Sequence, residues 1–185
     1  MNKLIEFFSF NGDNSQEKWT SSLHKFSYSG FNLVDEINNL NPELVLDVGC
    51  GYNEFKGKIK NLIGIDISNN QADIVSDFLN YECENNSVDV ILALGSINFI
   101  NFNTVSMQVQ WIYDKLKPGG LAYIRVNPSK PPGRLIEEDF YIWKDKDIWH
   151  FIDKHNFKLY NNAIITEFHK EDDRNSFRYF FILQK

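Results

Sequence analysis

Two aspartates and two glycines stand at the ends of short apolar runs, at the spacing of a nucleotide site. Asp47 lies near the end of the apolar run 44–48, just before Gly49 and Gly51. Asp66 ends the next apolar run, 19 residues beyond Asp47. An acid about 20 residues beyond a glycine turn is typical of a carboxylate that accepts from ribose hydroxyls. Glycines let a ligand lie against the backbone, and carboxylates also bind ammonium groups. These residues predict a site for a ribose-containing ligand.

Two interpretations that need a phosphate fit this stretch poorly. A phosphate loop requires four residues between its glycine and Gly-Lys, but five separate Gly51 from Gly57, and Ile59 stands where Ser or Thr is needed. In a dinucleotide fingerprint, Glu54 would replace the third glycine and repel a pyrophosphate. S-adenosylmethionine carries an ammonium group and a ribose but no phosphate, and an acid ahead of the glycines suits it. A generic strand-to-helix turn is the alternative.

Apolar periodicity predicts the elements that position these residues. Buried runs predict strands at 44–48, 62–67, 72–76, 88–94 and 121–126. Helical spacing predicts helices near 15–26 and at 31–40, 104–116 and 146–154. Asp145 is the expected N-cap of the last helix, and Pro118-Gly119-Gly120 is expected to stop the one before it. Two long strands, 157–170 and 176–185, are expected at the end of the chain.

Strands that alternate with helices predict the fold class. We expect an α/β, doubly wound, mostly parallel seven-stranded sheet with an antiparallel C-terminal strand. Ligands of such sheets bind beyond the carboxyl ends of the strands. The glycine turn at 49–51 is therefore expected at the ligand site.

An ordered set of motifs resembles the class I S-adenosylmethionine-dependent methyltransferases, especially their compact type-11-like group. The matching segments, in family order, are "VLDVGCG", "IGIDIS", "ADIVSDF", "SVDVILALGSINFI" and "LKPGGLAYIRVN". Together they extend from about Glu43 to Asn127. The segment "LKPGG" between a helix and a strand is the most telling of them.

The resemblance implies the Rossmann-like methyltransferase fold and S-adenosylmethionine as the cofactor, and it assigns roles to the strand ends. The first turn would lie under the methionine moiety, the second strand would end at the ribose and adenine, the third at the adenine amino group, and the fourth at the methionyl amino group. The residues implied, strand by strand, are Asp47, Gly49, Gly51 and Tyr52; Asp66 and Ile67; Asp77 and Phe78; and Leu94, Gly95 and Ser96. For Asp66 and Asp77, a strand-end cap is the alternative role.

Two departures from the family pattern concern the cofactor site. Asn53 stands at the third glycine-like position, and asparagine tolerates a left-handed backbone better than most residues. Asp77 follows Asp66 by 11 residues, too few for a full helix and a strand. The second crossover is therefore expected to be a loop, which leaves the adenine side more open.

The methyl acceptor is not identified by any motif. Displacement at a sulfonium methyl needs alignment more than a general base, so no catalytic residue is assigned, and His24, Tyr28 and Glu137 are only candidates. The loop "GSINF" lacks the Asn/Asp-Pro-Pro-aromatic motif of DNA amino methyltransferases, and the net charge is −6. A small-molecule acceptor is therefore expected, and nucleic acid is disfavoured. Two cysteines and unmatched histidines predict no metal site.

We expect one globular domain, in which residues 1–41 form a helical segment covering the substrate and residues 42–185 bind the cofactor. No run approaches the ~20 apolar residues of a membrane helix, and two scattered thiols fit a reducing compartment. A cytoplasmic location is expected, in the host cytoplasm if a virus encodes the chain. Two other functions stay open: a cofactor-binding regulatory or partner module, and a nucleic-acid methyltransferase with a basic groove of Lys130, Arg134, Lys144 and Lys146.

Overall fold

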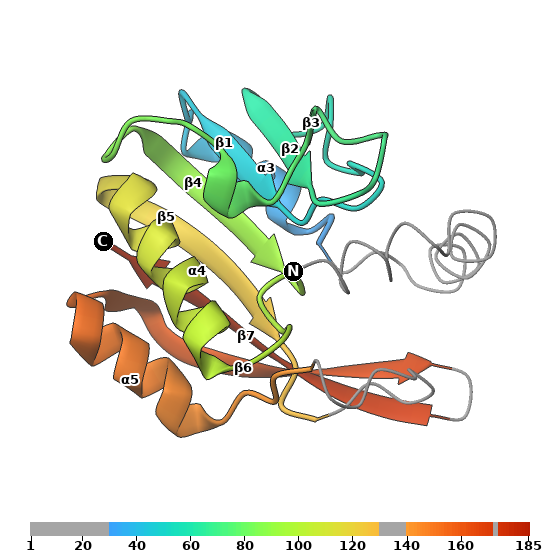
Figure 1. Cartoon of the computed structure of the whole chain (residues 1–185), viewed down its shortest axis with the longest axis vertical. Coiled ribbons are helices and arrows are strands. Elements are labelled where there is room, and N and C mark those ends of the chain that lie inside the picture. The colour runs from blue at the N-terminus through green and yellow to red at the C-terminus, as the bar shows by residue number, and fades with distance from the viewer. Residues whose placement is uncertain (1–29, 130–139, 172–173) are drawn as a thin grey trace.

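The computed structural model describes residues 30–129, 140–171 and 174–185 (Figure 1). Its centre is a seven-stranded sheet in the order β3-β2-β1-β4-β5-β7-β6. The strands are β1 (Val45–Val48), β2 (Leu62–Asp66), β3 (Ile74–Val75), β4 (Val88–Leu94), β5 (Leu116–Val126), β6 (Lys158–Glu171) and β7 (Arg174–Gln184). Strands β1 to β5 are parallel, and β7 lies antiparallel between β5 and β6. The predicted fold class is confirmed.

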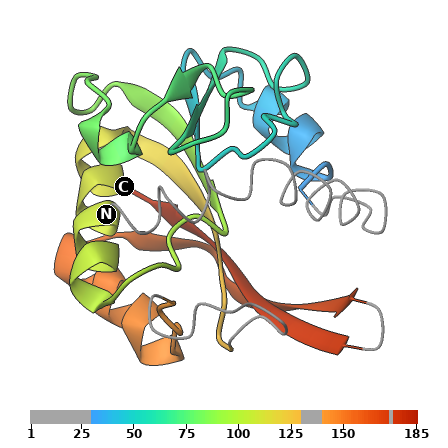
Figure 2. The same cartoon turned by 45° about the vertical axis from the view of Figure 1, so that its right-hand side comes forward.

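Helices cover both faces of this sheet (Figure 2). The helices α4 (Phe102–Lys115) and α5 (Asp145–His155) lie on one face, and α3 (Leu33–Asn39) lies on the other. Successive side chains of a strand point to opposite faces, so Leu46 of β1 packs with α4 and α5 while Val45 packs with α3. Because both faces are covered, the central strands are continuous apolar runs in the sequence.

The carboxyl edge of the sheet is where the loops of interest meet. In a doubly wound sheet each helix begins at the edge where the preceding parallel strand ends. The loop after β4 leads into α4 at this edge, and the segment after β5 leads toward α5 (Figure 1). The backbone N–H of Ser76 donates to the carbonyl of Asp66 at 2.8 Å, which joins the ends of β2 and β3.

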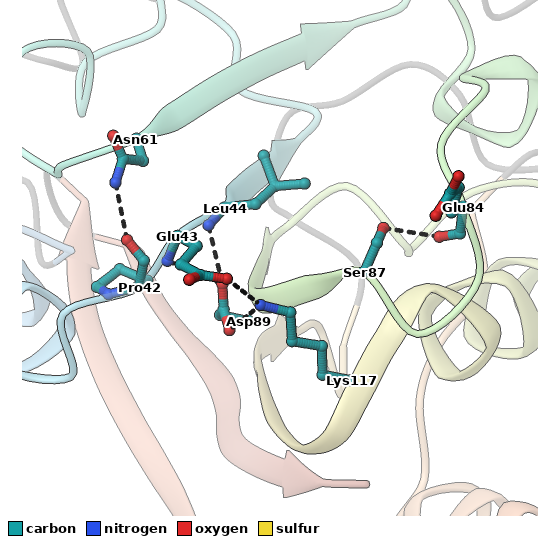
Figure 3. A network of polar contacts seen from close by, with 8 residues as sticks. All are labelled: Pro42, Glu43, Leu44, Asn61, Glu84, Ser87, Asp89 and Lys117. Atoms are coloured by element: carbon teal, nitrogen blue, oxygen red, sulfur yellow. Dashed lines mark hydrogen bonds and ion pairs between the residues drawn. The ribbon is translucent and has the colours of Figure 1, made fainter.

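A polar network ties together the opposite, amino edge of the sheet (Figure 3). The Asp89 carboxylate accepts from the backbone N–H groups of Glu43 and Leu44, both at 2.9 Å. The Lys117 ammonium lies 2.8 Å from the carboxylates of both Asp89 and Glu43. Partial burial acts to raise the pKa of Asp89, but these donors hold it below its usual value. The contacts fix the starts of β1, β4 and β5 relative to one another.

Two predicted boundaries are wrong. Asp145 is the first residue of α5 rather than its N-cap; Lys144 is the cap, and its N–H donates to the Asp147 carboxylate at 2.8 Å. The Pro-Gly-Gly segment does not itself stop α4, which ends at Lys115 where Leu116 turns extended and already begins β5. A register shift between β4 and β5 accommodates this early start, with Gly119 at a φ of 84°.

The described part of the predicted N-terminal segment is the helix α3. Leu33 and Ile37 bury their side chains against the sheet, and the Tyr123 hydroxyl donates to Glu36 at 2.8 Å. The expected helix near residues 15–26 lies outside the described residues. The division at residue 41 and the covering role of the segment stay predictions.

Candidate cofactor site

The turn after β1 has the left-handed backbone that its glycines predict. Gly49 and Gly51 have φ angles of 76° and 55°. The N–H groups of Gly49 and Cys50 donate to the carbonyl of Ile65 at 2.7 and 3.1 Å, which ties the turn to β2. A Cβ at Gly49 would lie 2.3 Å from the Cβ of Ser96. The turn and the loop after β4 are therefore in contact, and only glycine fits there.

Asp66 holds this turn from the end of β2. One carboxylate oxygen accepts from the N–H of Gly51 at 3.0 Å, and the other accepts from the N–H groups of Ser68 and Asn69 at 3.0 and 2.9 Å. Asp66 thus caps the strand end and links it to the glycine turn. Each carboxylate oxygen has two lone pairs, so further acceptor capacity is left for a hydroxyl. The predicted contact of Asp66 with a ribose stays a prediction.

Asp47 places a second acid beneath the turn, within reach of the charge of Asp66. Its side chain is 3% exposed, and burial together with the charge of Asp66 raises its pKa to about 7. Burial, followed by the charges of Asp47 and Asp66, also raises the pKa of the neighbouring Cys50 thiol. The Cys50 thiol is therefore neutral and a poor nucleophile. A cationic ligand group at this edge would lie near two acids, and the neutral Cys50 thiol would not react with it.

Asn53 completes the turn in place of a third glycine. Its φ is 57°, and its amide donates to the carbonyl of Gln71 at 3.1 Å and to the Asp73 carboxylate at 3.3 Å. Asp73 also accepts from the N–H of Gly64 at 2.8 Å and pairs with Lys56 at 2.7 Å. A Cβ at Gly64 would lie 2.2 Å from Asn53 Oδ1, so the Asn53 side chain fits against β2 only because residue 64 is glycine.

Sequence reasoning missed Asp73, because residues 72–76 predict a strand, whereas β3 has only two residues. No helix separates β2 from β3, so the residues between them form the expected loop. Partial burial acts to raise the pKa of Asp73, but hydrogen bonds from Lys56, Gly64 and Asn53 hold it below its usual value. Asp73 thus replaces a crossover helix as the support of the glycine turn. The signal that could have identified Asp73 is an acidic residue within a crossover too short for a helix.

The residues predicted for adenine have mixed surroundings. Asp77 caps the short 3₁₀ helix Phe78–Asn80 and accepts from the N–H of Leu79 at 3.0 Å. Phe78 is buried in the core, with its ring 5.2 Å from that of Trp111. Tyr52 and Ile67 are half-buried. A capping role is therefore present at Asp77, and the adenine contacts stay predictions.

The loop after β4 is held by a buried asparagine. Asn98 is fully buried; its amide donates to the carbonyl of Gly95 at 2.9 Å, and its oxygen accepts from the N–H of Asn127 at 2.9 Å. Gly95 has a φ of 103°. Within the described residues, Ser96 Oγ and Asn127 Oδ1 are buried atoms that have no hydrogen-bond partner. Two polar groups thus remain available to a ligand at the ends of β4 and β5, where Leu94, Gly95 and Ser96 are predicted to meet the cofactor.

The segment before α5 is fastened to the same loop. The N–H of Tyr141 donates to the carbonyl of Asn98 at 2.7 Å. The indole N–H of Trp143 donates to the carbonyl of Ile97 at 2.9 Å, and its backbone N–H donates to that of Asn127 at 3.0 Å. These contacts couple the loops after β4 and β5 into one unit. The contacts of Asn98 and Trp143 were not predicted, because nothing local in sequence marks contacts over 29 to 46 residues.

Several predicted residues cannot be placed. The catalytic candidates His24, Tyr28 and Glu137 lie outside the described residues, as do Lys130 and Arg134 of the alternative basic groove. Among residues 30–129, 140–171 and 174–185, no group of three or more His, Cys, Asp or Glu side chains is arranged to hold a metal ion. In the same part of the chain, no helix is long and apolar enough to cross a membrane. The cytoplasmic location stays a prediction.

Comparison with solved structures shows a shared fold. The solved structure of 1,6-didemethyltoxoflavin-N1-methyltransferase from Burkholderia thailandensis, with 1,6-didemethyltoxoflavin and S-adenosylhomocysteine bound, is 15% identical, with a TM-score of 0.72 over 98% of this chain and 87% of that one. An S-adenosylmethionine-dependent methyltransferase from Archaeoglobus fulgidus is also 15% identical, with a TM-score of 0.61 over 90% and 99%. The cyclase SpnF is 16% identical, with a TM-score of 0.58 over 83% and 78%.

A family model matches part of the sequence. Residues 46–124 match the family model described as a methyltransferase domain, of the type-11 kind. This stretch thus matches a methyltransferase domain, the chain has the fold of the S-adenosylmethionine-dependent methyltransferases, and the resemblance inferred from its motifs is confirmed. S-adenosylmethionine is the cofactor of this class, as the motifs predicted. No curated protein matches the chain.

Proposed function

We propose that this chain is an S-adenosylmethionine-dependent methyltransferase that acts on a small molecule. The observation that carries the proposal is the contact between Gly49 and Ser96, at the edge where Asp47 and Asp66 gather negative charge. It brings the turn after β1 against the loop after β4, which are the two segments expected to hold the methionine moiety.

The polar groups at this edge of the sheet fit the charge of this cofactor. Asp47 and Asp66 suit an ammonium group and hydroxyls, and Lys56 beside the turn is already paired with Asp73. A phosphate would meet repulsion from these acids. Ser96 Oγ and Asn127 Oδ1 are buried without a partner among the described residues, so a bound ligand would satisfy them.

The role of the protein in the reaction is alignment. S-adenosylmethionine, when bound, supplies an electrophilic methyl group, and an acceptor atom displaces the thioether in line. The carboxylates would hold the ammonium and ribose ends, while the glycines let the ligand lie close to the backbone. Asn98 holds the carbonyl of Gly95 and the N–H of Asn127. The loop after β4, here called the cofactor loop, is therefore fixed relative to the end of β5. Fixed alignment supplies much of the acceleration of such a displacement.

A small-molecule acceptor is supported by charge and by the likeness to the Burkholderia enzyme. The net charge of −6 opposes association with nucleic acid, which requires clustered cations. The Burkholderia structure contains 1,6-didemethyltoxoflavin, and its fold covers 98% of this chain. At 15% identity the likeness suggests a class of acceptor to test and no particular compound.

Binding without methyl transfer is the second candidate function. The similarity to the cyclase SpnF favours it, because one fold can host unrelated chemistries. A regulatory or partner module would keep the cofactor contacts and lack turnover. Conversion of S-adenosylmethionine to S-adenosylhomocysteine in the presence of an acceptor separates the two functions.

The deciding experiment is calorimetric titration of the full chain with S-adenosylmethionine and S-adenosylhomocysteine, alongside NAD and ATP. We expect saturable binding of the first two ligands only. Binding of NAD or ATP instead, or of none of the four, would refute the cofactor assignment. Product formation with a panel of small molecules, compared with DNA and RNA, then tests the acceptor class. Turnover on nucleic acid alone would contradict the small-molecule assignment.

A further inference from the structure

A cavity of about 850 Å³ opens where α4 and α5 begin. Both helix starts lie at the carboxyl edge of the sheet, near one another in both views (Figures 1 and 2). Its lining comes from residues 100–102 at the start of α4 and from residues 140–150, and it includes none of the residues predicted to bind the cofactor. The cavity is therefore a separate site beside the cofactor loop.

Aromatic rings form much of the wall. The ring of Phe102 lies 5.9 Å from that of Tyr141 and 5.6 Å from that of His150. Phe151 stacks behind Phe102 at 5.5 Å and holds its ring in place. Phe140 also lines the cavity. Fixed rings of this kind favour a planar, aromatic occupant.

The charged groups at the cavity favour an anion. Lys144 and Lys146 are exposed at its rim, and the described residues include no carboxylate paired with either ammonium group. Asp147 is the acid of the lining; it is buried and already accepts from the Tyr141 hydroxyl and the Lys144 N–H, both at 2.8 Å. Two cations are thus available to a ligand, while the carboxylate is engaged within the protein.

Ile100 adds backbone strain to this wall. Its φ is 72°, a left-handed conformation that β-branched residues rarely adopt. Such strain gathers at functional sites. Ile100 lies between Asn98, which holds the cofactor loop, and Asn101, which caps α4 by accepting from the N–H of Thr104 at 3.1 Å. The strained residue therefore joins the cavity to the loop that carries Gly95.

We propose that this cavity binds the methyl acceptor, and that the acceptor is a planar aromatic molecule with an anionic group. The ring would lie against Phe102, and the anion would face Lys144 and Lys146. This inference rests on the proposed function, which supplies the role of methyl acceptor. The cavity wall and the cofactor loop are joined by hydrogen bonds: the N–H of Tyr141 donates to the carbonyl of Asn98, and the Asn98 side-chain amide donates to the carbonyl of Gly95.

The test uses 2-naphthoate as the probe and neutral 2-naphthalenemethanol as its match, titrated calorimetrically into the full chain with and without saturating S-adenosylhomocysteine. We expect 2-naphthoate to bind about two- to fivefold more tightly than the alcohol, the range that a solvent-exposed charge contact supplies. Lys146→Gln should reduce this preference, because one of the two cations is lost. Lys154→Gln is the matched control on α5, because the Lys154 ammonium donates to Ser106 at 3.0 Å and lies outside the lining. Phe102→Leu should weaken both probes alike.

Each outcome separates the cavity from the cofactor assignment. Equal affinity for the two probes, no binding of either, or equal effects of Lys146→Gln and Lys154→Gln would overturn the proposed cavity even if S-adenosylhomocysteine binds. Failure of S-adenosylhomocysteine to bind, with the charge preference intact, would refute the methyltransferase function and the acceptor role but retain an anion-selective aromatic site. Tighter binding of 2-naphthoate in the presence of S-adenosylhomocysteine is the result expected of an acceptor.

Discussion

Among single residues, Gly49 is the one whose replacement best tests the cofactor site. Its φ of 76° and the 2.3 Å approach of a Cβ to Ser96 combine backbone strain with a clash. Gly57 has nearly the same φ, 75°, but no atom lies within 4 Å of the position of its Cβ. The two glycines therefore separate the effect of strain from that of the clash.

We expect Gly49→Ala to weaken binding of S-adenosylhomocysteine about tenfold or more, because the turn after β1 and the loop after β4 must move apart. Gly57→Ala should leave the affinity unchanged. Both variants should lose about 1–2 kcal/mol of unfolding free energy through left-handed strain, and Gly49→Ala should lose more. Calorimetry and urea denaturation measure the two effects. Equal affinities of the two variants would contradict the proposed contact.

The buried carboxyl of Asp47 gives the free chain a pH-dependent stability. Burial and the charge of Asp66 raise its pKa from 3.8 to about 7, so the folded state holds this proton more tightly than the unfolded state. The contribution is present below about pH 4 and is lost as the pH rises through 7. Asp47→Asn should remove this loss, which amounts to at most about 4 kcal/mol.

The measurement is urea denaturation between pH 5 and pH 8. Asp47→Asn should be more stable than the unmodified chain at pH 8 and yet bind S-adenosylhomocysteine more weakly, because the same charge is proposed to serve the ammonium group. An unchanged dependence of stability on pH in this variant would show that Asp47 is not the titrating group.

At the scale of elements, Asn98 joins the loop after β4 to the end of β5. Asn98→Leu leaves the carbonyl of Gly95 and the N–H of Asn127 without their partner, at a cost of about 2–4 kcal/mol for two buried groups. We expect this variant to bind S-adenosylhomocysteine more weakly as well, since Gly95 and Ser96 are carried by the loop. Thermal unfolding and calorimetry measure both losses.

Asn101 supplies the control for that variant. It caps α4 without a described contact to the cofactor loop, so Asn101→Ala should cost about 1 kcal/mol of stability and leave the affinity unchanged. If both variants lose affinity in proportion to stability, Asn98 has no specific positioning role. If only Asn98→Leu loses affinity, the loop is held in place for the ligand.

At the scale of the whole molecule, Asp47 and a second described group, His155, give the stability opposite slopes between pH 5 and pH 8. His155 of α5 is 6% exposed, lies among Tyr113, Phe151 and Phe157, and its Nε2 has no partner among the described residues. Burial first, and then the charge of Lys154, lower its pKa below 6.5. The unfolded chain therefore takes up this proton more readily, and stability is full above pH 6.5 and falls as the pH drops below it.

His155→Leu should flatten the loss of stability on the acid side and expose the opposite slope of Asp47. The unfolding free energy of the variant, measured by urea denaturation from pH 5 to pH 8, should then only decrease as the pH rises. A variant that loses stability in acid as steeply as the unmodified chain would rule out His155 as the responsible group.

The sequence by itself determined the class of fold and the place of the glycine turn. Strands buried on both faces are continuous apolar runs, so the strand at 44–48 could be predicted from consecutive residues. A turn with left-handed backbone favours glycine or asparagine, so the turn at Gly49, Gly51 and Asn53 could be predicted in the same way. The antiparallel end of the sheet was predictable from two long runs around a polar turn. These features depend on a few consecutive residues, which is why their pattern is visible without the fold.

The tertiary structure alone decided which distant residues meet. The contact of Gly49 with Ser96, the support of Asn53 by Asp73, and the fastening of Trp143 to Ile97 join segments that are 20 to 47 residues apart. Their partners follow from the order and register of the strands, which place the loops after β1, β4 and β5 at one edge. Local propensity contains no information about that order, because the free energy that selects it comes from burying both faces of the sheet at once.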